Sequence, residues 1–287
     1  MDALILSPGS APLTGSIEDY PEGIIIPINK PYRWTSADVI RKVKYAAIRH
    51  FGKKNLKVGH AGTLDPLATG VLLVCIGKAT KLAETLQSHD KEYIAGVTFG
   101  ATTPSYDLEK EIDRMFPYEH ITPEAVEKAL EPFIGEQDQV APLFSAKSVD
   151  GVRAYELARK FHAEGKTLDE AAQELIRVAK INITELEMLE FISASRSGSE
   201  NRATPTGNSE SNASSRINVT DNSELGLPRA VIRMACSKGT YVRAFARDLG
   251  EKLDSGAHLD SLQRSRSGEF RVENALTVDQ VMDLLAK

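Results

Sequence analysis

The residues with the clearest chemical potential lie in one glycine-rich stretch, residues 59–70, which reads Gly-His-Ala-Gly-Thr-Leu-Asp-Pro-Leu-Ala-Thr-Gly. Its glycines permit backbone conformations that other residues rarely adopt, and Pro66 biases the preceding Asp65 towards extended geometry. Such a loop presents one carboxylate, Asp65, and one imidazole, His60, in fixed directions. A fixed carboxylate suits nucleophilic or electrostatic catalysis. The alternative is a surface turn with an incidental acid.

Composition and absent signatures limit the function classes. Hydrophobic residues make up 41% and charged residues 26% of the chain, as in soluble globular proteins. No apolar run is long enough for a membrane span, and the N-terminus lacks the features of a signal peptide. Cys75 and Cys236 are the only cysteines, the histidines lack metal-ligand spacing, and no Walker A or Gly-x-Ser-x-Gly motif occurs. We therefore expect a cytoplasmic protein that uses neither metal nor cofactor.

A basic run offers a surface for an acidic partner. Between residues 30 and 60 lie nine Lys or Arg residues against one acid, Asp38, although the whole chain has a net charge of -5. Clustered cations attract a nucleic-acid backbone whatever the total charge is. The alternative is a solvated helix face, which charge runs commonly form.

The order of the expected elements indicates an α+β domain. Apolar or alternating runs predict strands at residues 23–28, 71–76, 93–99, 181–191, 229–236 and 269–272. Capping and spacing signals predict helices that begin at Thr35 or Ser36, at 122–123 with an end at Gly135, at 151, at 240 and at 277. Because these elements show no βαβ rhythm, we expect a mixed, mostly antiparallel central sheet flanked by helices.

Two segments have too few apolar residues to belong to a core. Residues 1–21 are rich in Pro, Gly and Ser and predict a flexible arm before a domain at 22–287. Residues 193–227 consist mainly of Ser, Asn, Gly, Thr and Arg. Their little apolar surface cannot offset the entropy of ordering, so they predict a disordered insertion within the domain.

The glycine-rich stretch resembles the catalytic loop of the TruB family of tRNA pseudouridine synthases, Gly-His-x-Gly-x-Leu-Asp-Pro-x-Ala-x-Gly, at every fixed position. Further matches follow in the family's order at residues 77–81, 91–93, 142–159, 236–243 and 256–264. The resemblance runs from about residue 24 to residue 286, interrupted by the polar insertion. It implies a pseudouridine-synthase fold with an RNA-binding cleft.

The resemblance implies three catalytic residues. Asp65 is expected to be the carboxylate that attacks C1′ or C6 of the target uridine. Arg243 would pair with Asp65 and keep it ionised. Tyr93 would stack on the target base and could exchange a proton.

It also implies four residues that bind the substrate. The target uridine must leave the folded T-loop to react, and His60 would fill the vacated space. Tyr241 would pack beneath the site, and Leu262 would line its pocket. Lys81 would contact phosphates, together with the basic helix at residues 41–49.

Three features depart from the family's pattern. Arg33 stands where the opening motif has a glycine, and the run from Thr103 to Asp107 lacks the aspartate that usually follows the threonine. The chain ends at Lys287, so we do not expect the C-terminal PUA module of many relatives.

The resulting hypothesis is a monomeric enzyme that isomerises uridine 55 in the T-stem-loop of tRNA without an obligatory protein partner. One alternative is a non-catalytic tRNA folding chaperone, although a pure binder does not need Asp65, Tyr93 and Arg243 together. The other alternative is a pseudouridine synthase that acts on other RNA stem-loops.

Overall fold

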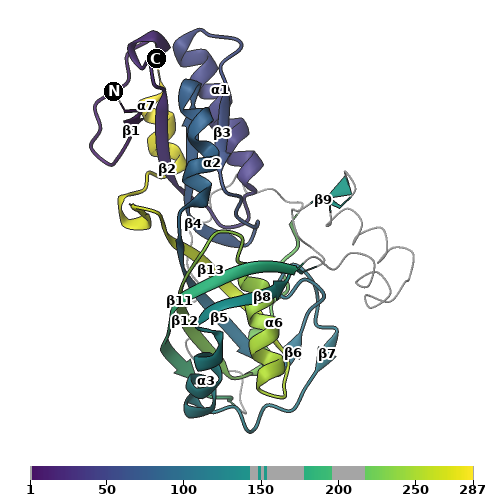
Figure 1. Ribbon diagram of the computed structural model, residues 1–287. Coiled ribbons are helices and arrows are strands. Elements are labelled where there is room, and N and C mark those ends of the chain that lie inside the picture. The colour runs from purple at the N-terminus through teal and green to yellow at the C-terminus, as the bar shows by residue number, and fades with distance from the viewer. Residues whose placement is uncertain (1, 143–147, 150–151, 154–177, 196–216, 287) are drawn as a thin grey trace. The chain divides into compact units, whose positions relative to one another are not determined.

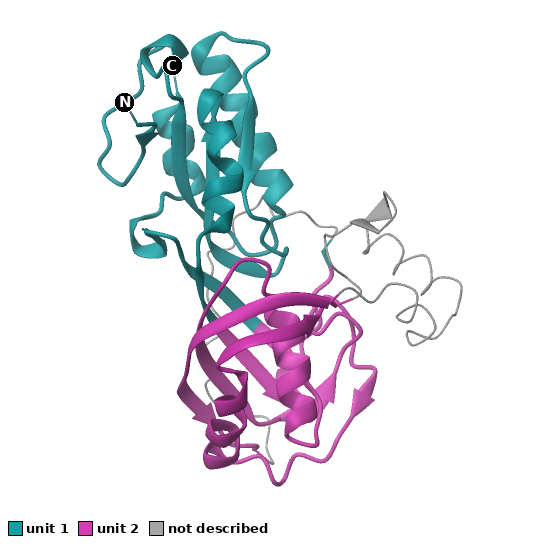
Figure 2. Cartoon of the chain, viewed as in Figure 1, with its two compact units in different colours: residues 1–94, 201–217, 261–287 teal, residues 95–200, 218–260 magenta. Residues whose placement is uncertain are grey.

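The computed structural model describes residues 2–142, 148–149, 152–153, 178–195 and 217–286. The fold is α+β, as the sequence predicts, with a large and mostly antiparallel sheet whose strands fall into two compact units (Figure 2). Unit 1 consists of residues 1–94, 201–217 and 261–287, and unit 2 consists of residues 95–200 and 218–260. Among the described residues, no helix is long and apolar enough to cross a bilayer.

The sheet of unit 1 is built around β4 (Ala68–Ile76), which is almost wholly buried. β4 pairs antiparallel with β2 (Ile24–Lys30) and β3 (Val58–Ala61), and parallel with the end of β13 (Ala257–Ser267). The short outer strands are β1 (Leu4–Ile5), which pairs with β2, and β14 (Phe270–Arg271), which pairs with β13. The unbroken apolar run from Val71 to Ile76 allows β4 to be buried on both faces.

The basic run forms α1 (Ser36–Phe51), which contacts β3 and α7 (Figure 1). Its N-terminus has a reciprocal capping box between Thr35 and Asp38, and Gly52 ends it in the left-handed conformation. As predicted, one face buries aliphatic residues while Arg41, Lys44 and Arg49 stay exposed. The other helical elements of unit 1 are η1 (Ile17–Asp19), η2 (Gly77–Leu82), α2 (Ala83–Ser88), η5 (Val272–Asn274) and α7 (Val278–Leu284).

The N-terminal segment packs on unit 1, whereas the sequence predicts a flexible arm. β1 pairs in parallel with β2, and Leu6 and Ile17 are buried. His50 lies with its Nε2 2.9 Å from the carbonyl oxygen of Thr14. The residues that anchor the segment are few, the short run Leu4 to Leu6 and the single Ile17, in a segment otherwise rich in Pro, Gly and Ser, so overall composition did not reveal them.

Unit 2 carries most of β5 (Lys91–Phe99), followed across its sheet by β12 (Arg229–Cys236), β11 (Val178–Ile192) and β8 (Gly135–Val140). β11 pairs antiparallel with both of its neighbours. The unit also contains α3 (Pro123–Leu130), α6 (Val242–Lys252), η3 (Glu131–Phe133), η4 (Ser223–Leu225), β6 (Ala101–Thr102), β7 (Arg114–Met115), β9 (Ser148–Val149) and β10 (Val152–Arg153).

Several predicted boundaries in unit 2 need correction. α3 ends at Leu130, and Gly135 begins β8 instead of ending the helix. Pro132 explains the early end because a proline has no N–H for an α-helical hydrogen bond. Of the helix predicted at residues 151–165, residues 152–153 form a strand and the others lie outside the described residues.

The predicted insertion at residues 193–227 is described only at its two ends, since residues 196–216 lie outside the described part. At these ends the backbone N–H of Ser195 donates to the carbonyl of Gly226 at 2.9 Å. Leu227 is 1% exposed. The C-terminal end of the segment therefore joins the core of unit 2.

Candidate active site

Asp65 lies in the turn between β3 and β4, here called the Asp65 loop (residues 62–67). The preceding residue is held by Ser36, the first residue of α1, which accepts from the N–H of Leu64 at 2.9 Å and donates to its carbonyl at 3.2 Å. The carbonyl of Asp65 accepts from the N–H of Ala68 at 3.1 Å. The side chain of Asp65 therefore starts from a backbone that is fixed on both sides.

A buried lysine holds the other side of the Asp65 loop. Lys30 is fully buried, and its Nζ donates to the carbonyls of Trp34 at 2.6 Å, Pro31 at 2.9 Å and Pro66 at 3.2 Å. Burial lowers the pKa of Lys30 to about 7, and the charge of Asp65 opposes this shift. The sequence shows Lys30 only as part of the opening motif and gives no sign of its burial.

Arg33, the first departure from the family's pattern, has φ of 62°. Glycine adopts this left-handed conformation without strain, which explains why the pattern has a glycine here. The N–H of Arg33 donates to the carbonyl of Pro66 at 3.0 Å, and its Nη2 donates to the carbonyl of Ile217 at 2.9 Å. These bonds hold the arginine in a strained conformation.

His60 lies in β3 opposite Val74 of β4 and is partly buried. Its Nδ1 is enclosed without a hydrogen-bond partner among the described residues. Burial lowers the pKa of His60, and the nearby cation of Arg264 lowers it further. Both effects favour the neutral form of the imidazole.

The other predicted residues of unit 1 lie on three elements. Leu262 in β13 is opposite Ala68, three residues after Asp65, in the parallel register with β4. Tyr93 lies in β5 and is 9% exposed. Lys81 is exposed near the end of η2, as a phosphate contact requires.

Arg243 lies in the first turn of α6 in unit 2 and is 5% exposed. Its Nη1 donates to the carbonyl of Ser105 at 3.1 Å, and its Nε lies 3.8 Å from Oδ2 of Asp107. Asp107 also accepts from Ser105 Oγ at 2.6 Å and from the N–H of Glu109 at 2.9 Å. Sequence reasoning named Asp107 only as part of a departing run, so it missed this partner.

Tyr241 is the residue that precedes α6, and its backbone is held by the side chain of Gln139. The amide oxygen of Gln139 accepts from the N–H of Tyr241 at 2.8 Å, and its nitrogen donates to the carbonyl at 3.1 Å. Gln139 is 3% exposed, so its two hydrogen bonds fix the start of α6. A buried glutamine in β8 has no sequence signature.

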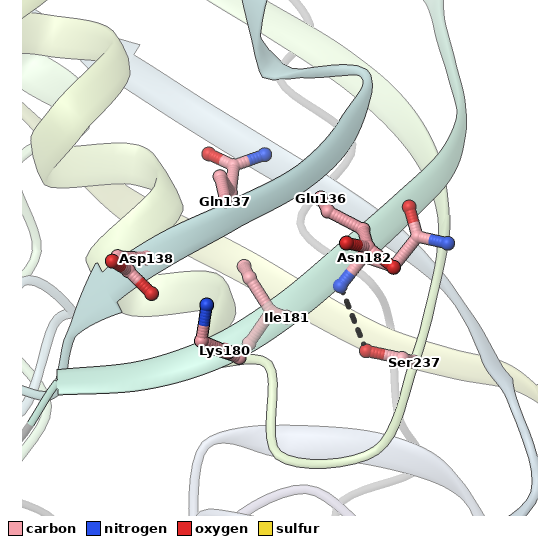
Figure 3. Close-up of a pocket in the computed structure, with 7 residues that line it drawn as sticks. All are labelled: Glu136, Gln137, Asp138, Lys180, Ile181, Asn182 and Ser237. Carbon is pink, nitrogen blue, oxygen red and sulfur yellow. Dashed lines mark hydrogen bonds between the residues drawn. The ribbon is translucent and has the colours of Figure 1, made fainter.

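The turn before Tyr241 is anchored on β11 next to a polar pocket (Figure 3). Ser237 accepts from the N–H of Asn182 with its Oγ at 2.9 Å and donates its own N–H to the Asn182 carbonyl at 2.8 Å. The pocket is lined by Glu136, Gln137, Asp138, Lys180, Ile181, Asn182 and Ser237. None of the predicted site residues lines it.

The seven predicted site residues divide between the two units. Unit 1 holds Asp65, His60, Lys81, Tyr93 and Leu262, and unit 2 holds Tyr241 and Arg243. Within the described ranges, no group of three or more His, Cys, Asp or Glu side chains could hold a metal ion. Unit 1 offers a carboxylate on a hydrogen-bonded backbone and an imidazole whose neutral form is favoured, and unit 2 offers a buried guanidinium.

Comparison with known families gives two matches. Residues 49–199 match the TruB family pseudouridylate synthase (N terminal domain), and residues 243–287 match the tRNA pseudouridylate synthase B C-terminal domain. A tRNA pseudouridine synthase B of Phocaeicola vulgatus is 46% identical over 93% of this chain and 95% of its own length. The enzyme of the same name from Bacteroides thetaiotaomicron is 47% identical over 90% of this chain and 91% of its own length.

Solved structures share the fold. A chain in the crystal structure of a Cbf5-Nop10-Gar1 complex matches with a TM-score of 0.56 and 24% identity. The match covers 91% of this chain and 54% of the other chain. At this identity the likeness concerns the fold alone.

Proposed function

Since this chain belongs to the TruB family of pseudouridylate synthases and is a tRNA pseudouridine synthase, we propose that it converts uridine 55 of the T-loop with Asp65 as its catalytic carboxylate. The reaction breaks the C1′–N1 bond and joins C1′ to C5 of the same base. The C5 proton is lost and N1 gains one, so atoms and electrons balance without a cofactor. The observation that carries the proposal is the Asp65 loop, whose backbone is hydrogen-bonded on both sides of Asp65.

Three residues are assigned to the chemistry. Asp65 attacks the target nucleoside or stabilises the cationic sugar, and a fixed carboxylate serves either route. Arg243 pairs with Asp65 in the working site and keeps it ionised. Tyr93 stacks on the target base and exchanges a proton with it. The near-complete burial of Arg243 supports its role because a buried guanidinium interacts strongly with a carboxylate.

Four residues are assigned to binding. The target base must be flipped out of its stack, at a cost of roughly a few kcal/mol, and His60 occupies the space it leaves. The lowered pKa of His60 supports this role, since a neutral ring has a smaller desolvation cost than an imidazolium when it enters the base stack. Tyr241 packs beneath the site, Leu262 lines its pocket, and Lys81 contacts phosphate.

The substrate is tRNA, and we assign recognition to its T-stem-loop. The exposed cations of α1 contact phosphates outside the reacting nucleotide. We further propose that the enzyme acts as a monomer in the cytoplasm, with no obligatory protein partner and no metal or cofactor.

The test is site-resolved mapping of pseudouridine in tRNA transcripts incubated with the purified chain, and in cellular RNA with and without it. Conversion at position 55 and its loss from cells that lack the chain are expected. Modified stem-loops in other RNAs, with tRNA unchanged, would assign a different substrate. Binding of tRNA with no modification of any RNA would favour a folding chaperone.

A further inference from the structure

Arg264 is one of the largest fully buried side chains of the molecule, at 2% exposed. It lies in β13 opposite Gly70 of β4, and its guanidinium reaches the first residues of the Asp65 loop. Nε donates to the carbonyl of Val71 at 2.7 Å, Nη2 to that of Gly62 at 3.1 Å, and Nη1 to that of Thr63 at 3.4 Å. One side chain thus joins the first residues of the loop to β4.

The backbone of Arg264 packs closely against that of Gly70. A Cβ added at Gly70, which has φ of 99°, would lie 2.2 Å from the carbonyl oxygen of Arg264. The two backbones therefore meet more closely than any other residue at position 70 allows. Consequently the side chain of Arg264 starts from a fixed point of the backbone.

The partners of Arg264 are unusual for a buried cation. Buried charges are normally paired with opposite charges, yet no carboxylate of the described residues forms an ion pair with Arg264. All its hydrogen bonds go to backbone carbonyls. An apolar side chain would fill the same space without the desolvation penalty of a charge. We therefore attribute the buried guanidinium to its hydrogen bonds with these backbone carbonyls.

The backbone that Arg264 binds belongs to a loop in which successive carbonyls are hydrogen-bonded. The carbonyls of residues 62–66 all accept a hydrogen bond, and Arg264 supplies the donors for the first two. The next three are satisfied by Ser36, by the N–H of Ala68 and by Lys30 with the N–H of Arg33. Without Arg264, the carbonyls of Gly62 and Thr63 would lose these bonds, and the loop would be held only by the pairing of Ala61 with Leu73 before it and from Leu64 onwards. Gly62, with φ of 92°, adds no side-chain restraint.

We propose that Arg264 is a positioning residue for pseudouridine formation: its guanidinium holds the carbonyls of Gly62 and Thr63 and thereby fixes the direction of the Asp65 carboxylate. The proposal rests on the proposed function of Asp65. Misplacement of a reacting group by about 1 Å can lower a rate by about 100-fold. Loss of this anchor should therefore slow the chemical step more than it weakens tRNA binding.

The experiment compares Arg264→Gln and Arg264→Lys with the wild type. Single-turnover rates with saturating enzyme, tRNA dissociation constants and melting temperatures are measured, with the rates taken well below each melting temperature. Arg266→Gln is the matched control, because Arg266 lies two residues along β13 and donates to the carbonyl of Gly268, away from the Asp65 loop. Asp65→Asn provides the reference for lost chemistry.

For folded Arg264→Gln we expect a rate about 100-fold lower, with binding within about threefold of wild type. Arg264→Lys should be intermediate, since the single nitrogen of lysine replaces three guanidinium nitrogens that each bind a different carbonyl. A folded Arg264→Gln enzyme with a wild-type rate, or a rate loss explained by equal loss of binding, overturns the proposal. If Arg264→Gln does not fold, a folded Arg264→Lys with at least a tenfold loss supports it. Failure of both to fold assigns Arg264 to stability alone and overturns it. An inactive wild type, by contrast, refutes the proposed function itself.

Discussion

Arg243 and Asp107 form a buried ion pair in unit 2, with Nε of the arginine 3.8 Å from Oδ2 of the aspartate. The side chain of Arg243 is 6% exposed and that of Asp107 is 9% exposed. Asp107 is itself fixed by Ser105 Oγ and by the N–H of Glu109. The aspartate therefore offers the guanidinium a rigid neighbour of opposite charge and restricts its direction.

Replacing Asp107 with Asn should harm both stability and turnover. Removing one partner of a buried pair leaves the other charge uncompensated, so we expect the free energy of unfolding to fall by about 3 kcal/mol. If Arg243 acts in catalysis, its looser orientation should also lower the single-turnover rate by about tenfold or more. Urea unfolding and single-turnover assays measure the two effects. Asp113→Asn, at an exposed position, is the control and should change neither.

The left-handed backbone of Arg33 gives a prediction about stability. Both Arg33→Gly and Arg33→Ala remove the bond to the Ile217 carbonyl, but only glycine relieves the strain at φ of 62°. We expect Arg33→Gly to be more stable than Arg33→Ala by about 1 kcal/mol. Chemical denaturation of the two variants tests this. Equal stability would mean that the surrounding structure relaxes around alanine.

Lys30 should make stability depend on pH. Its pKa is about 7 in the folded chain, against 10.5 for an ordinary lysine, so between these values the unfolded chain binds more protons. The free energy of unfolding should therefore rise from pH 7 to pH 10, by up to a few kcal/mol from this group. Lys30→Met should show a flatter curve, because its side chain cannot titrate. Denaturation curves of both proteins across this range provide the measurement, and parallel curves would contradict the prediction.

Binding of tRNA should depend strongly on salt although the net charge of the chain is -5. If six phosphates are neutralised, log affinity should fall with log salt at a slope of roughly -4 to -5. Exchanging the exposed Lys44 and Arg49 for Gln should make this slope shallower by about 1 to 2. The same exchange at Lys128 and Lys252, which lie in unit 2, controls for net charge. A wild-type slope near zero would show that α1 does not face RNA.

Sequence patterns predicted the helices and strands whose residues follow the usual apolar spacing and capping signals. The aliphatic run of β4 and the Thr35 capping box of α1 gave those elements close to their observed bounds. β13 was missed as a strand because it carries charged and polar residues throughout. Arg264 in this strand is buried, whereas arginines are usually exposed, so its residue type did not indicate its burial.

The candidate site residues likewise divide into those with a recognisable sequence pattern and those without one. Asp65 and His60 were recognised because a glycine-rich loop with two chemical groups is uncommon and matches a family. Lys30 and Gln139 were not assigned roles, because their importance comes from backbone carbonyls and N–H groups far away in the chain. Such partners have no side-chain identity that a sequence could reveal.

Asp65→Asn should abolish pseudouridine formation and leave tRNA binding within a few-fold of wild type. The change is nearly isosteric, and the Asp65 loop is held through its backbone, so no steric cause for rearrangement arises. Asparagine lacks the charge needed to attack the nucleoside or to stabilise a cationic sugar. Binding depends mostly on phosphate contacts and stacking, which the substitution leaves in place.

Single-turnover conversion and a binding titration with the same tRNA measure both effects of Asp65→Asn. Asp90→Asn, which removes the same charge from an exposed position of unit 1, should remain fully active. A drop of equal size in both variants would trace the loss to general electrostatics. Substantial conversion by Asp65→Asn alone would reject Asp65 as the catalytic carboxylate, because no other carboxylate lies in the Asp65 loop to replace it.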